Sequence, residues 1–111
     1  MANRRTRISF PIFNDYEVRV VCSHNLAATG RRLGEKDSLV NAEAGFIVRP
    51  EQPGVGWLVF GRNPMPDTVA HEAFHAVKAL FKYAGAAPEE ESFAYHLDFL
   101  VGRIHRFLKR G

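Results

Sequence analysis

The chain has 111 residues, 46% of them hydrophobic, and a formal net charge of +3 at pH 7. This composition can bury one hydrophobic core but leaves no room for a second lobe, so we expect one domain over residues 1–111, with residues 1–7 as a flexible basic tail. The apolar run that follows, residues 8–13, is interrupted by Pro11 and is too short for a signal peptide or a membrane span. A single Cys22 cannot form a disulfide within the chain, which suits a reducing compartment. We therefore expect a cytoplasmic protein without membrane contact.

The positive charge is concentrated in arginine-rich ends. At the C-terminal end the basic residues are Arg103, Arg106, Lys109 and Arg110. Interleaved aromatic residues and a recognisable nucleic-acid-binding module are missing. We therefore interpret these residues as a solvated basic face and do not expect nucleic-acid binding. No feature of the sequence predicts an oligomeric state.

The first half of the chain predicts one strand and one short helix. Residues Tyr16–Cys22 alternate between apolar and polar side chains as a strand does. Residues Ser23–Leu33 have the pattern of a short helix, with Ser23 as its N-terminal cap and Gly34 just after its end. The polar segment Glu35–Asn41 is predicted to be a loop.

The second half predicts a hairpin and two long helices. The strand-like segments Ala44–Arg49 and Gly56–Phe60 are separated by the turn sequence at 50–54, which contains two prolines and a glycine. Helical periodicity then extends over about Asp67–Ala84 and again over Pro88–Lys109. An order of strand, short helix, hairpin and two helices predicts an α+β fold.

The segment His71-Glu72-Ala73-Phe74-His75 is an HExxH motif in the middle of the first long helix. Residues four apart on a helix lie one turn above each other, so both imidazoles can reach one metal ion while Glu72 points at a water bound to it. This is the arrangement of a zinc hydrolase. The competing interpretation is two solvent-facing histidines on a surface helix.

A zinc site of this kind needs a third protein ligand. A histidine six residues after His75 would be one solution, but Phe81 stands there. The remaining candidates are three consecutive acidic residues at the start of the second long helix, which would also stabilise its first turn through the helix dipole. They are Glu89, Glu90 and Glu91.

Helical phase does not decide among these three carboxylates. The apolar face of the second helix, which contains Phe93 and Leu97, lies nearer to Glu90 than to Glu91. A different face carries Glu91, small residues and Asp98, and if the two helices met along it, Glu91 would reach the histidines and Asp98 could orient an imidazole. Both alternatives remain open from the residues alone.

The motif His71-Glu72-Ala73-Phe74-His75-Ala76-Val77, followed by Glu91-Ser92-Phe93-Ala94-Tyr95, resembles the gluzincin metallopeptidases. The likeness is strongest to the very small members found among phage and prophage proteins and to the minimal gluzincins, and it covers about residues 44–104. It implies a small zincin-like domain in which His71 and His75 bind Zn²⁺, Glu72 is the general base and Glu91 is the third ligand. The chain departs from the larger gluzincins in having Glu90 before that ligand, where Asn is common, and Tyr95 four residues after it, where Asp is common.

The expected function is zinc-dependent hydrolysis of a peptide or protein substrate. Tyr95 is the leading candidate for stabilising the developing oxyanion, because it neighbours the proposed ligand face. The resemblance also implies that the strand Trp57–Phe60 forms the edge of the substrate groove, where an extended peptide can add as one more strand. The alternative function is a zinc-binding protein without catalysis, such as a phage factor that binds a host protein.

Overall fold

The computed structural model describes residues 3–35 and 39–110 of the chain. In these ranges the structure is α+β, which confirms the predicted class, and the helices and strands follow the predicted order after one additional strand at the N-terminus. The elements are β1 (Arg4–Ser9), β2 (Glu17–Cys22), α1 (Leu26–Arg32), β3 (Ala44–Val48), β4 (Val55–Phe60), α2 (Pro66–Ala84) and α3 (Glu90–Lys109).

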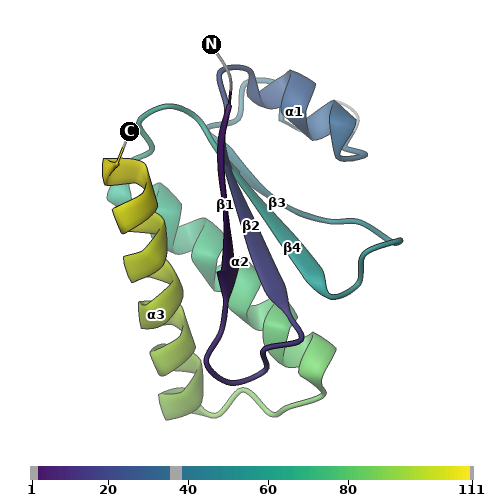
Figure 1. Ribbon diagram of the computed structural model, residues 1–111, viewed down its shortest axis with the longest axis vertical. Coiled ribbons are helices and arrows are strands. Elements are labelled where there is room, and N and C mark those ends of the chain that lie inside the picture. The colour runs from purple at the N-terminus through teal and green to yellow at the C-terminus, as the bar shows by residue number, and fades with distance from the viewer. Residues whose placement is uncertain (1–2, 36–38, 111) are drawn as a thin grey trace.

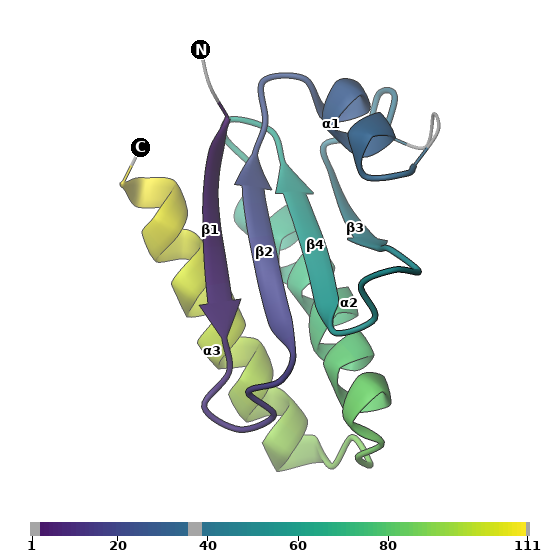
Figure 2. The same cartoon turned by 45° about the vertical axis from the view of Figure 1, so that its right-hand side comes forward.

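The strands form one mixed sheet in the order β1-β2-β4-β3 (Figure 2). The outer pairs β1/β2 and β3/β4 are antiparallel, and the central pair β2/β4 is parallel. The predicted hairpin is therefore confirmed as β3 and β4, with Ala44 opposite Phe60 and Val48 opposite Gly56. Because β2 and β4 take the central positions, β1 and β3 are the edges of this sheet.

The two long helices cover one face of the sheet, and α1 lies over one end of the other face (Figures 1 and 2). Strand side chains alternate between the two faces, so Val18, Val20 and Leu58 point toward the helices and are fully buried. They join Leu80 of α2 and Ile104 of α3 in the main core. A smaller core on the opposite face contains Val21, Leu33, Leu39, Ile47, Trp57 and Val59.

Helix α2 forms where the sequence predicts it. Pro66 occupies the first turn, where its missing N–H costs nothing, and Asp67 adds a carboxylate at the positive end of the helix dipole. Gly85 ends the helix in the left-handed conformation with a φ of 69°, and its N–H donates to the Lys82 carbonyl. None of the helices described between residues 3 and 110 is long and apolar enough to span a membrane.

The flexible tail expected over residues 1–7 is wrong from Arg4 onward, because Arg4–Ser9 form β1; residues 1–2 lie outside the described ranges. The guanidinium of Arg4 donates to the Phe107 carbonyl at the end of α3 and lies 4.7 Å from the centre of the Phe107 ring. Ile8 is buried in the main core. These contacts between the two ends of the chain hold β1 in place, and no local pattern reveals them.

Helix α1 is shorter than predicted. Its N-terminal cap is Asn25, whose side-chain oxygen accepts a hydrogen bond from the Ala28 N–H at 3.0 Å. Ser23, the predicted cap, is buried and its hydroxyl lies 2.7 Å from that of Thr29. Part of the predicted loop Glu35–Asn41, residues 36–38, lies outside the described ranges.

Candidate metal centre

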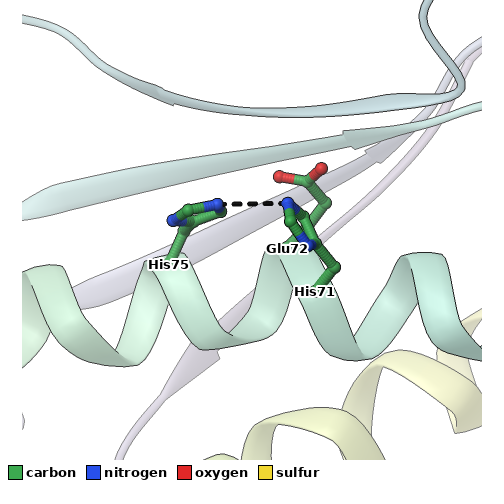
Figure 3. A group of neighbouring side chains, drawn as sticks. All are labelled: His71, Glu72 and His75. Carbon is green, nitrogen blue, oxygen red and sulfur yellow. Dashed lines mark hydrogen bonds between the residues drawn. The ribbon is translucent and has the colours of Figure 1, made fainter.

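His71, Glu72 and His75 form a group on α2 that can hold a metal ion. Their ligand atoms, the imidazole nitrogens and a carboxylate oxygen, all lie within 4.8 Å of one another. Figure 3 shows the two imidazoles one helical turn apart, with the Glu72 carboxylate beside them. Among the residues that the structure describes, these three make up the group of His, Cys, Asp and Glu side chains that meets this condition.

The spacing of the two histidines fits a tetrahedral metal. The Nε2 atoms of His71 and His75 are 3.2 Å apart, within hydrogen-bond distance of each other. Two nitrogens bound to zinc at 2.0–2.1 Å and at a tetrahedral angle would be about 3.3 Å apart. The helix therefore already holds both nitrogens at the separation that such an ion needs.

Strand β3 contacts the site through an aromatic ring. The Phe46 ring stacks on the His75 imidazole, with centroids 6.5 Å apart and planes inclined by 13°. Phe46 in turn lies close to Gly56 of β4, where an added Cβ would be 2.8 Å from the Phe46 ring and 2.6 Å from the Tyr16 hydroxyl. Glycine at position 56 thus leaves the space that Phe46 occupies beneath His75.

A hollow of about 480 Å³ adjoins the group. Its lining includes His71 and Glu72 together with Thr68 in the first turn of α2 and Glu43 just before β3. The Thr68 hydroxyl donates to the Glu43 carboxylate at 3.4 Å, which connects the start of β3 to α2. Sequence reasoning missed Glu43, because it lies in a polar segment without periodicity and reaches the site only through the packing of β3 on α2.

Glu91, the predicted third ligand, lies exposed in the first turn of α3 and is outside the three-residue group. Near the start of α3, Phe93 packs between two rings of α2, with centroid distances of 5.3 Å to Phe74 and 5.5 Å to Phe81. Glu90 is also exposed. The role of Glu91 as third ligand stays a prediction, as does the alternative at Glu90.

Of the two alternatives left open for α3, the structure does not show the one in which the two helices meet along the small-residue face. Ala94 and Asp98 on that face are exposed, and Tyr95 is 52% exposed. The helices instead meet where Phe93 contacts Phe74 and Phe81, because aromatic rings bury far more apolar area than alanine and glycine do. Asp98 is outside the three-residue group, and the proposed roles of Asp98 and Tyr95 stay predictions.

His96, another polar residue near the predicted ligand face, belongs to the core. It is buried, and its Nδ1–H donates to the Ser92 carbonyl at 2.7 Å. Its Nε2 has no hydrogen-bond partner, and the ring packs against those of Phe10, Phe13 and Phe81. This histidine therefore has a structural role.

The strand expected at the groove edge is also corrected. Trp57–Phe60 belong to β4, which pairs with β2 on one side and with β3 on the other. The strand with a free edge beside α2 is β3, and Trp57 points to the opposite face of the sheet, into the smaller core.

Comparisons of the chain with protein-family models, with curated proteins and with solved structures found no match.

Proposed function

We propose that this chain is a zinc-dependent hydrolase of peptide bonds. His71 and His75 hold the metal, Glu91 completes its protein ligands and Glu72 is the general base. The observation that carries the proposal is the separation of 3.2 Å between the two Nε2 atoms, together with a carboxylate within 4.8 Å of both. Two imidazoles and one carboxylate are the ligand set of many catalytic zinc sites, which keep a further position for water.

Bound zinc would polarise the scissile carbonyl and lower the pKa of its water toward neutrality. Glu72 would accept a proton from the attacking water and pass it to the leaving amine. Its position suits this role, because Glu72 is half-buried and lines the hollow beside His71. A general base must lie within hydrogen-bond reach of the proton that it abstracts, and a carboxylate beside the two imidazoles is suitably placed for this.

The substrate would approach along β3. This strand is an edge of the sheet, and Phe46 on it stacks against His75. An extended peptide that pairs with the free backbone groups of β3 would therefore pass beside the metal-binding group. Main-chain pairing of this kind gives affinity with little dependence on the substrate side chains, so we propose a protein or peptide substrate in extended conformation.

One observation favours a second function. Among the described residues, Glu72 is itself the carboxylate that forms a group with the two histidines. If Glu72 binds the metal directly, the site has three ligands but no free base, and the chain is then a non-catalytic zinc-binding protein whose partner is another protein. The two functions make opposite predictions for a single substitution, Glu72→Gln.

The decisive comparison is between the wild-type protein, Glu72→Gln and the matched control Glu89→Gln, which changes an exposed glutamate outside the group. For the enzyme, Glu72→Gln keeps its zinc, while hydrolysis of a mixed peptide library falls by roughly 10²-fold to 10⁴-fold. The control Glu89→Gln keeps both its zinc and its hydrolytic activity. Loss of zinc from Glu72→Gln would support the non-catalytic function. Equal cleavage by Glu72→Gln and wild type, or none by the wild type, would contradict the enzyme.

A further inference from the structure

The face of the sheet opposite the long helices carries a row of arginines. Arg5 and Arg7 of β1 point to this face, and Arg7 is directly opposite Arg19 of β2. Two more arginines, Arg31 and Arg32, are exposed at the end of α1, which lies over one end of this face (Figure 2). We call these five residues the arginine face.

Two hollows lie along the arginine face and share Arg5 as a lining residue. The larger, of about 860 Å³, is lined by Asn3, Arg5, Ser23, His24, Asn25, Ala28, Thr29, Arg31 and Arg32. The smaller, of about 230 Å³, is lined by Arg5, Thr6, Arg7, Arg19, Val20, Val21 and Trp57. None of these lining residues is acidic, and guanidinium groups line both hollows, joined in the larger one by the side-chain amides of Asn3 and Asn25.

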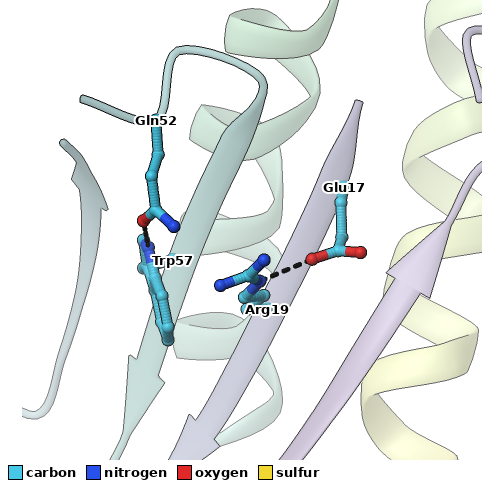
Figure 4. A network of polar contacts seen from close by, with 4 residues as sticks. All are labelled: Glu17, Arg19, Gln52 and Trp57. Atoms are coloured by element: carbon cyan, nitrogen blue, oxygen red, sulfur yellow. Dashed lines mark hydrogen bonds and ion pairs between the residues drawn. The ribbon is translucent and has the colours of Figure 1, made fainter. Parts of the chain in front are cut away.

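Two of the three arginines that the strands contribute to the arginine face have no ion-pair partner within the described ranges. Arg7 and Arg19 face each other across two strands, and like charges so placed are mutually destabilising. Arg19 is paired with Glu17 and lies 5.2 Å from the centre of the Trp57 ring (Figure 4). Within the ranges that the structure describes, Arg5 and Arg7 have no carboxylate within ion-pair distance. An anionic partner would relieve this repulsion.

The chemistry of the arginine face favours phosphate groups. Its cations are all arginines, whose planar guanidinium groups bind phosphate in a bidentate manner. Arg5 and Arg7 are two residues apart on a strand, so their Cα atoms are about 6.7 Å apart, which suits a ligand with repeated charges along its length. The Asn25 side-chain amide, which lines the larger hollow, can donate a further hydrogen bond to a phosphate oxygen.

We propose that the arginine face binds single-stranded nucleic acid through its phosphates. Unpaired bases can stack on exposed guanidinium planes, whereas a duplex keeps its bases inside. The sequence did not predict this surface, because its arginines and its tryptophan come from β1, β2, α1 and β4 and are adjacent only in the folded chain. The proposal is independent of the metal centre on α2.

Trp57 provides a local readout of binding. It is the single tryptophan of the chain, it lines the smaller hollow and it is only 9% exposed beneath Arg19. A strand that displaces or orders the Arg19 guanidinium should change the Trp57 fluorescence. The experiment titrates the full chain with oligo-dT, followed by this fluorescence at salt concentrations between about 50 and 200 mM.

The test variant is Arg5→Ala with Arg7→Ala, and the matched control is Arg103→Ala with Arg106→Ala, which removes the same charge from exposed positions of α3. Loss of two phosphate contacts should weaken binding at least tenfold and reduce the slope of log K against log salt by about 1.4. The control should keep both affinity and slope. Arg31→Ala with Arg32→Ala tests the larger hollow independently and should also weaken binding. Circular dichroism melts verify that each variant is folded.

Three outcomes would overturn the proposal. The wild type could leave the Trp57 fluorescence unchanged and show no binding to oligo-dT at the lower salt. The control could lose as much affinity as the test variant, which would mean that net charge alone is responsible. A duplex, or the sulfated polyanion heparin, could bind more tightly than oligo-dT at equal charge, which would assign the arginine face to another class of partner.

Discussion

On the face of the sheet that α2 and α3 cover, the strands contribute fully buried apolar side chains such as Val20 and Leu58, whereas neighbouring strand positions on the opposite face carry Arg7 and Arg19. Strand β2 contributes to both sets, with Val20 on one face and Arg19 on the other, because consecutive side chains point in opposite directions. The metal-binding group on the helical side therefore comes from the outer surface of α2, where His71 lies. On the opposite side the strands themselves can present charge to a ligand.

The largest effect is expected at the metal ligands on the helical side. If Glu91 completes the site, Glu91→Ala should weaken zinc binding by more than the roughly 10- to 100-fold that loss of a supporting hydrogen bond causes. The control Glu89→Ala should cost only a few tenths of a kcal/mol in stability, since it removes only an interaction with the helix dipole. Isothermal titration measures the zinc affinity of each variant, and urea unfolding measures its stability. If Glu90→Ala abolishes binding and Glu91→Ala does not, the third ligand is Glu90.

The difference between the two faces is itself measurable with one residue from each. Leu58 is fully buried toward the helices, and Leu58→Ala should lower the free energy of unfolding by about 2–5 kcal/mol. Arg19 makes an ion pair and a cation–π contact on the opposite face, so Arg19→Ala should cost at most about 1 kcal/mol. Urea unfolding checks both values. Equal losses would mean that the arginine face is as important to folding as the core.

A smaller effect, which depends on pH, is expected at Tyr16. Burial raises the pKa of Tyr16 from 10.0 to about 12, and its hydroxyl has no hydrogen-bond partner. Because the folded pKa is above the unfolded one, the contribution of the neutral phenol to stability is complete below pH 10 and is lost as the pH rises through about 12.

Tyr16→Phe should therefore differ little from wild type at pH 7 and should be the more stable of the two between pH 10 and 12. Urea unfolding of both proteins over this pH range makes the comparison. A difference in stability that does not change with pH would show that ionisation of Tyr16 has no part in alkaline unfolding.

What the sequence predicted well depends on local pattern. The metal group comes from five consecutive residues, His71–His75, on one helix, so helical spacing alone brings the imidazoles together. Helix α2 carries its own start at Pro66 and its own stop at Gly85, so its bounds were predicted to within one residue. The hairpin of β3 and β4 is likewise contained in one segment with a turn sequence between its strands.

What the sequence did not predict depends on contacts between distant segments. Strand β1 is held partly by the contact of Arg4 with Phe107 at the far end of the chain. Because the sequence does not show this contact, the arginines of β1 were interpreted as part of a flexible tail. The central position of β4 follows from its parallel pairing with β2, which no local pattern specifies. Helix α3 meets α2 through the face that carries Phe93, whose ring contacts Phe74 and Phe81. Helical periodicity alone did not show whether this face or the small-residue face would be buried.

The account depends most on the metal site, and elemental analysis of the purified protein tests it directly. After reconstitution and removal of excess metal, we predict about one zinc ion per wild-type chain and almost none in the folded double variant His71→Ala, His75→Ala. This result follows from the 3.2 Å separation of the two Nε2 atoms beside Glu72. A wild-type protein without zinc, or a double variant that keeps it, would contradict the assignment of a metal centre to α2.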